Sequence, residues 1–123
     1  MIDFENNRYD EKKLREIIRN NKLSNDDWVC ISIFQDFSES FIRDFKDKVA
    51  WGCISAYQKL SEYFIREFKD SVYWGWISKH QILSEGFMME FIEDIDIYWL
   101  NKNEKIDQEV KDRIIAYKEV VNL

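Results

Sequence analysis

Apolar and polar side chains recur along this chain with a period of 23 residues. Tryptophan occurs at Trp28, Trp51 and Trp74, and each one is followed at constant offsets by isoleucine, serine, glutamine and phenylalanine. The recurring residues are Ile31, Ile54 and Ile77; Ser32, Ser55 and Ser78; Gln35, Gln58 and Gln81; and Phe41, Phe64 and Phe87. Self-similarity at a fixed step is typical of repeat proteins. The pattern predicts a single repeat domain, 1–123, with full copies at 28–50, 51–73 and 74–96 and degenerate capping copies at 1–27 and 97–123.

Each copy contains two short amphipathic segments. In the copy 51–73, Trp51 starts an i, i+3, i+7 pattern and Leu60 starts an i, i+4, i+5, i+8 pattern, and both suit one face of a helix. A serine that suits a helix N-cap precedes the second segment in every full copy, at Ser38, Ser61 and Ser84. Glu62 and Arg66 are spaced for an i, i+4 ion pair.

Helices of about eight residues are marginal in isolation, so they must be stabilised by stacking on the next copy. The sequence therefore predicts an all-α fold, a small α-solenoid of tandem two-helix repeats. An alternative stays open because 29–34 and 72–77 are rich in β-branched and aromatic residues, which favour strands. A strand-plus-helix repeat of the leucine-rich kind has a similar period, but its L-x-x-L-x-L-x-x-N pattern does not occur here.

The composition suits a folded domain. The 123 residues are 46% hydrophobic and 16% aromatic, and no apolar stretch approaches the length of a membrane span. The first ten residues are acidic and polar, so we expect no signal peptide and a cytoplasmic location, in the host cell if the protein is viral. Cys30 and Cys53 occupy one repeat position, which Trp76 fills in the third copy, and we expect both thiols to be free and buried.

No motif of catalysis is visible, so we expect no enzymatic activity, no cofactor and no metal site. His80 stands at the position of Phe34 and Tyr57, which predicts a half-buried ring in an aromatic slot. The recurring serine and glutamine are interpreted as structural, because a glutamine amide can satisfy backbone groups in turns. The recurring tryptophans are interpreted as core rather than as a base-stacking platform. Lysine and arginine are interleaved with acidic residues, so direct nucleic-acid binding is not expected.

The second copy carries a motif with a wider resemblance. The unit D-K-V-x-W-x-x-I-S-x-Y-Q-K-L-S-E-x-F-I-R-E-F-K, from Asp47 to Lys69, resembles a short tandem repeat in proteins of large DNA viruses, phages and some bacteria. The resemblance covers 28–96 closely and the ends loosely. It implies a repeat architecture. It does not imply a particular activity or ligand. Because short phage proteins of this type often inhibit host defence, anti-CRISPR proteins included, the resemblance implies by analogy an inhibitor of a defence complex such as a CRISPR-Cas effector.

The third copy differs from the others in charge. It holds five acidic residues and one basic residue, so it carries −4 of the chain's net charge of −6. Met89 replaces the arginine of earlier copies, and Ile92 replaces the lysine. Apolar groups at positions that normally carry charge indicate an interaction surface, and an acidic rim would steer a basic partner. The predicted acidic face consists of Glu85, Met88, Met89, Glu90, Ile92, Glu93, Asp94 and Asp96.

Two interpretations of the third copy stay open: these apolar groups contact a partner, or they pack on the atypical C-terminal copy. The first makes the protein a non-enzymatic protein-binding module that docks on a basic host protein, with no membrane involved. The alternative function is a structural or self-associating repeat protein, in which exposed apolar groups pair two copies of the chain.

Overall fold

The computed structural model describes residues 2–122, and all regular secondary structure in this range is helical. The all-α prediction is confirmed, and the strand-plus-helix alternative is excluded for the described residues. The chain divides into two compact units, Met1–Gln58 and Lys59–Leu123. The boundary falls inside the predicted second copy, between its first and second helix, and the single repeat domain over the whole chain stays a prediction.

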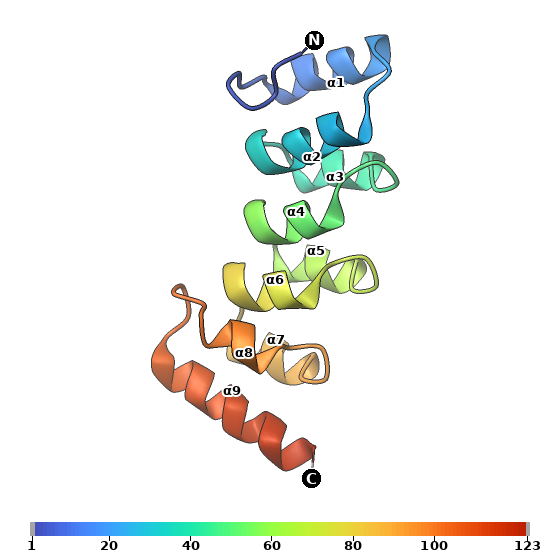
Figure 1. Ribbon diagram of the computed structural model, residues 1–123. Coiled ribbons are helices and arrows are strands. Elements are labelled where there is room, and N and C mark those ends of the chain that lie inside the picture. Colours follow the sequence, from blue (N-terminus) through green and yellow to red (C-terminus); the bar gives the residue numbers. More distant parts are fainter. Residues whose placement is uncertain (1, 123) are drawn as a thin grey trace. The chain divides into compact units, whose positions relative to one another are not determined.

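Within its described residues, 2–58, unit 1 contains four helices (Figure 1). They are α1 (Glu11–Asn20), α2 (Asn25–Phe34), α3 (Glu39–Asp44) and α4 (Trp51–Tyr57). The first helices of two successive copies, α2 and α4, lie side by side. Helix α2 begins before Trp28 because Ser24 and Asp27 form a capping box, which adds a turn at its start.

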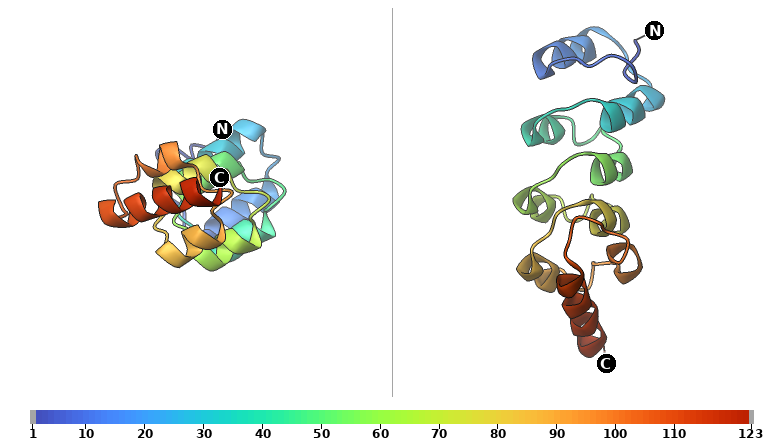
Figure 2. Two further views of the ribbon diagram at one scale, coloured as in Figure 1. Left: turned by 90° about the horizontal axis from the view of Figure 1, so that it is seen from below. Right: turned by 90° about the vertical axis from the view of Figure 1, so that its left-hand side faces the viewer.

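The described part of unit 2, residues 59–122, contains the other five helices. They are α5 (Glu62–Glu67), α6 (Trp74–His80), α7 (Glu85–Glu90), α8 (Ile97–Leu100) and α9 (Gln108–Val121). Helix α6 packs on α8, one repeat step later in the sequence, and α7 packs on α9, the long helix coloured red in Figure 2. Helix α9 thus takes the place that the second helix of a further copy would occupy. It has 14 residues, whereas the second helices α5 and α7 have six each.

The predicted serine N-caps are confirmed. The Ser38 hydroxyl accepts a hydrogen bond from the Phe41 amide, and Ser61 and Ser84 cap α5 and α7 in the same way. The first helices of the later copies start without a side-chain cap; the amide of Ala50, which precedes α4, instead donates to the Ser32 hydroxyl of α2. The starts of α3, α5 and α7 are therefore satisfied by their own serines, whereas the residue that precedes α4 is bonded to a serine of the preceding copy.

The recurring glutamine satisfies the other end of the first helix. The Gln58 side-chain amide donates to the carbonyl oxygens of Ser32 and Gln35, at 2.9 and 2.8 Å, which lie at the C-terminal end of α2. Gln35 donates in turn to Phe4 O and Asn7 O in the N-terminal capping segment. Carbonyl oxygens at the C-terminal end of a helix receive no hydrogen bond from within that helix, and those of an irregular segment receive none from a helix either. A buried side-chain amide therefore pairs them. The structural interpretation of the glutamines is confirmed.

The recurring tryptophans belong to the scaffold, as expected. Trp28 is buried, with its ring centroid 5.5 Å from that of Phe45, and the half-buried Trp74 stacks on Phe91 at 5.2 Å. The Trp74 indole N–H also donates to the Lys69 carbonyl at 3.0 Å. Cys30 and Cys53 are free thiols, as predicted, but they are half-buried rather than fully buried. Burial raises the pKa of both thiols, so they stay protonated near neutral pH.

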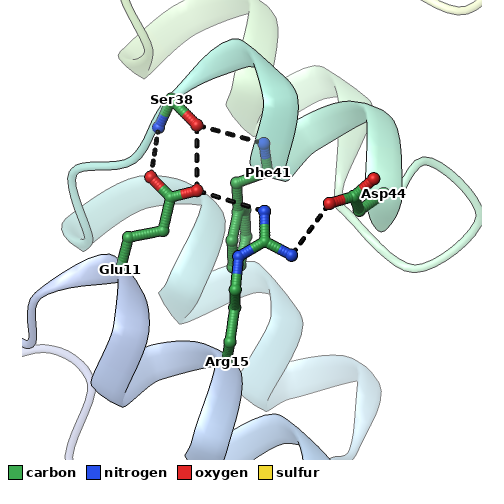
Figure 3. A network of polar contacts seen from close by, with 5 residues as sticks. All are labelled: Glu11, Arg15, Ser38, Phe41 and Asp44. Atoms are coloured by element: carbon green, nitrogen blue, oxygen red, sulfur yellow. Dashed lines mark hydrogen bonds and ion pairs between the residues drawn. The ribbon is translucent and has the colours of Figure 1, made fainter.

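Charged side chains tie successive copies together at the starts of the second helices. In Figure 3, the Glu11 carboxylate of α1 accepts hydrogen bonds from the Ser38 amide and hydroxyl, at 3.1 and 2.9 Å. Arg15 contacts both Glu11 and, at 2.8 Å, Asp44 of α3. Partial burial opposes ionisation of Glu11, but the bonds from Ser38 and the charge of Arg15 outweigh it and lower its pKa. In unit 2, Glu62 and Ser84 repeat this carboxylate–serine arrangement.

Candidate functional site

Two of the three apolar residues of the predicted acidic face, Met88 and Ile92, are not at the surface. Met88 is 0% exposed and Ile92 is 7% exposed, so the prediction that both offer contacts to a partner is wrong. Met88 occupies the position of Ile65, which is core in its own copy. Ile92 follows α7, the helix that α9 covers, and Lys118 of α9 donates a hydrogen bond to the nearby Ile95 carbonyl. The burial of these two residues and the packing of α9 on α7 favour the interpretation that this stretch packs on the C-terminal copy.

Two of the predicted acidic residues are held in ion pairs within unit 2. Arg66 makes a bidentate contact with Glu90, at 2.8 and 3.1 Å, rather than the expected pair with Glu62. Arg113 of α9 makes an equivalent contact with Glu85. These hydrogen bonds lower the pKa of both carboxyl groups. The two glutamates connect neighbouring copies, which accounts for them without a partner.

The rest of the predicted face is mixed. Asp96 caps α8, because its carboxylate accepts a hydrogen bond from the Trp99 amide. Met89 is 38% exposed, and Glu93 and Asp94 are exposed. The acidic surface that stays available to a partner is therefore smaller than the sequence predicts, and it centres on Met89, Glu93 and Asp94.

A larger exposed apolar surface lies on α6 and α8 of unit 2. We call it the aromatic face, and it consists of Tyr73, Trp76, Tyr98 and Trp99. The ring centroids of Trp76 and Trp99 are 5.5 Å apart, and Tyr98 meets Trp99 edge-on at 4.9 Å. Trp76 is 37% exposed and Tyr98 is 63% exposed. These rings support one another but leave much of their surface in water, which is unfavourable unless something covers them.

The aromatic face contains a shallow groove of about 310 Å³, lined by Tyr73, Trp74, Gly75, Trp76 and Trp99. Gly75 forms part of its wall. A Cβ atom at this position would lie 3.3 Å from the Trp99 ring, which is a tight contact. The glycine thus lets α8 approach α6 closely. We call this depression the aromatic groove.

Three lysines border the aromatic face. The Lys79 ammonium lies 5.2 Å from the Trp99 ring centroid and 5.9 Å from that of Trp76. The Lys102 ammonium lies 4.9 Å from the Tyr98 ring centroid. A second depression, of about 260 Å³, is lined by Lys79, His80, Lys102, Glu104 and Lys105. We call it the basic groove.

The sequence contains a signal for the aromatic face in the register of the repeat. The repeat position of Cys30 and Cys53 becomes Trp76 in the third copy, and one further step of 23 residues reaches Trp99. Two cysteines give way to two tryptophans at a position where the scaffold accepts a small side chain. A register extended into 97–123 would have brought the two indoles together. Their exposure depends on the packing of α8 and could not be read from the register.

His80 provides a test of the electrostatics beside this face. The ring is half-buried in contact with Trp76, as predicted, at a centroid distance of 5.8 Å. Partial burial and the positive charges of Lys79 and Lys105 lower its pKa below the ordinary value of 6.5. The unfolded chain keeps the ordinary pKa and binds the proton at higher pH, so stability should decline as the pH falls through 6.5.

We expect a proton NMR titration of His80, the single histidine of the chain, to give a midpoint below 6.5. The variant Lys79→Gln should move this midpoint upward, because it removes a nearby positive charge. The variant Lys59→Gln, at an exposed lysine of the same unit, serves as the control and should leave the midpoint unchanged. A wild-type midpoint at or above 6.5 would contradict the geometry described for this ring.

Other kinds of site were sought among residues 2–122. No group of three or more histidine, cysteine, aspartate or glutamate side chains is placed there to hold a metal ion. In the same range, no helix combines the length and the apolar composition needed to cross a bilayer. Comparison with protein-family models, curated proteins and solved structures found no match to this chain.

Proposed function

We propose that this protein is a non-enzymatic protein-binding module whose principal contact surface is the aromatic face of unit 2. The observation that carries the proposal is the exposure of Trp76, Tyr98 and their neighbours on a scaffold that has no structural need for them. The equivalent position in unit 1 carries cysteine, and the helices there pack without an aromatic ring at it. Tryptophan and tyrosine are enriched at the centres of protein interfaces.

The chemistry of the aromatic groove favours binding over catalysis. Its lining offers indole and phenol rings and a glycine, without a carboxylate, imidazole or thiol side chain among them. Rings of this kind bury a large area at low cost in side-chain entropy, since each has two rotatable bonds. They suit the recognition of a partner better than the transfer of a proton.

The residues of the acidic face that stay exposed, Met89, Glu93 and Asp94, are proposed as a second and smaller contact for a basic region of a host protein. The idea that the partner belongs to a host defence complex, such as a CRISPR-Cas effector, rests on the repeat motif's resemblance to viral and phage proteins. It is supported by that resemblance alone, and it makes the host cytoplasm the proposed place of action.

The proposal predicts which substitutions abolish binding in a pull-down from host lysate. The variant Tyr73→Ser with Tyr98→Ala removes two exposed rings and should lose the captured protein, because each ring at an interface centre is worth about 2 kcal/mol or more. The control Tyr63→Ala with Tyr117→Ala removes exposed rings elsewhere in unit 2 and should retain it. The variant Glu93→Lys with Asp94→Lys separates the acidic contact from the aromatic one. Equal capture by the wild type and Tyr73→Ser/Tyr98→Ala, at equal thermal stability, would refute the proposal.

Self-association is the second candidate function, and it is favoured by Val120 and Val121, which are exposed near the end of α9. Sedimentation velocity at two concentrations distinguishes it from the first. A concentration-dependent dimer that Val120→Lys dissociates would support self-association, and a monomer at both concentrations would exclude it.

A further inference from the structure

We propose that the aromatic face recognises an acidic peptide segment of its partner, with an apolar side chain in the aromatic groove and carboxylates in the basic groove. The inference rests on the proposed function and names the chemistry of the partner. It concerns the same surface, but it is carried by a separate observation, namely that the lysines around the rings contact aromatic rings rather than carboxylates.

Lys79 lies between the two grooves. This residue lines the basic groove, and its ammonium group contacts the rings of Trp76 and Trp99, which line the aromatic groove. An extended segment that places a leucine or phenylalanine in the aromatic groove, against the two indoles, would therefore bring its next side chains within reach of Lys79 and Lys102. Successive side chains of an extended segment point to opposite sides, so the carboxylates are expected two residues from the apolar anchor.

The lysines of this site differ from the other basic residues of unit 2 in what they contact. Arg66 and Arg113 each form a bidentate ion pair with a glutamate. Among residues 2–122, no carboxylate pairs with Lys79 or Lys102. Their ammonium groups make cation–π contacts with aromatic rings instead. Aromatic rings hold the ammonium groups in position through cation–π attraction without neutralising their charge. The site thus presents positive charge that is oriented and unneutralised.

Charge complementarity favours an acidic segment as the partner. The chain as a whole is strongly acidic, at −6, yet the basic groove sets three lysines against a single acidic residue, Glu104. A basic segment would meet repulsion here, whereas an acidic segment would gain ion pairs beside a low-dielectric aromatic surface. Below its lowered pKa, His80 would add a further positive charge to the same groove.

An acidic peptide fits better than single-stranded nucleic acid, which is also anionic. Nucleic-acid grooves track the phosphate backbone with an extended row of basic groups and leave aromatic faces open for stacking. Here the basic groups form one short cluster, and lysine ammonium groups already lie over the rings of Trp76, Trp99 and Tyr98. The net negative charge of the chain would also repel a polyphosphate.

The test uses the full chain as bait for a displayed library of random 12-residue peptides. We expect the selected peptides to be enriched in aspartate and glutamate around one apolar or aromatic residue. A synthetic peptide from the pool should then bind the variant Lys79→Gln with Lys102→Gln about tenfold more weakly or worse, which corresponds to about 1.4 kcal/mol. The control Lys59→Gln with Lys69→Gln, at exposed lysines of unit 2, should stay within about twofold of the wild type.

The other outcomes separate the two proposals. Selected peptides that need Tyr73 and Tyr98 but carry no acidic bias would overturn the acidic partner and leave protein binding by the aromatic face intact. A pool that is empty, or that binds Tyr73→Ser/Tyr98→Ala as well as the wild type, would overturn both. Binding of an oligo(dT) strand that Lys79→Gln/Lys102→Gln abolishes, in the absence of selected peptides, would replace the peptide by single-stranded nucleic acid.

Discussion

Replacing Phe64 with alanine should lower the free energy of unfolding by about 3–5 kcal/mol, the range measured for large-to-small changes at fully buried aromatic positions. The Phe64 side chain is 0% exposed, and its ring centroid lies 4.7 Å from that of Phe68. The substitution removes the transfer free energy of the ring and leaves a cavity. Helix α5 has only six residues, so it has little intrinsic stability with which to hold its place once the ring is gone.

Urea unfolding followed by circular dichroism measures this effect. The neighbouring variant Tyr63→Ala is the matched control, because that ring is 73% exposed and its loss should change stability by about 0.5 kcal/mol or less. If Phe64→Ala fails to fold, the variant Phe64→Leu gives a smaller cavity and a measurable loss of about 1–2 kcal/mol. Equal stability of Phe64→Ala and Tyr63→Ala would contradict the packing described for unit 2.

Replacing Gln35 with leucine should destabilise unit 1 by about 2–4 kcal/mol, although leucine is the more hydrophobic residue. The buried Gln35 amide donates to Phe4 O and Asn7 O, both at 2.6 Å, and its carbonyl accepts from the Tyr9 amide at 3.0 Å. Leucine fills the volume but leaves three backbone groups without a partner. An unsatisfied buried group costs about 1–3 kcal/mol, and some of that cost is relieved where water can enter.

Two measurements check this prediction. The first is the unfolding free energy beside the control Gln108→Leu, which makes the same substitution at an exposed position and should be close to neutral. The second is hydrogen exchange of the Tyr9 amide, which should accelerate in Gln35→Leu and stay slow in the control. A variant as stable as the wild type would mean that the hydrogen bonds of Gln35 do not hold the N-terminal capping segment on α2.

Much of the scaffold could be predicted because its determinants are local and repeated. The serine caps follow from a residue preference at a helix start, and Ser38 and Ser84 act as that preference requires. The glutamine's role followed from its recurrence at a position next to a turn. By contrast, the pairing of Arg66 with Glu90 rather than Glu62 depends on the distance between copies, which the spacing within one helix does not contain.

The candidate site was the harder part to predict, and Ile92 shows the reason. The change from arginine to Met89 and from lysine to Ile92 is visible in the sequence, and it correctly marked the third copy as different. Whether such a residue faces water depends on what packs on it. Helix α9 covers α7, so Ile92 is interior, while α8 is only four residues long and leaves the rings of Tyr98 and Trp76 exposed.

The sequence by itself determined the period, the helical class and the structural roles of the recurring serine and glutamine, because a repeated unit must satisfy the same backbone groups in each copy. The tertiary structure alone decided which of the unusual side chains of the last copies reach the surface. The physical reason is that exposure at the end of a stack depends on the length and placement of the terminal helices, α8 and α9, which no longer follow the repeat. Their packing moved the candidate site from the acidic residues after α7 to the aromatic rings of α6 and α8.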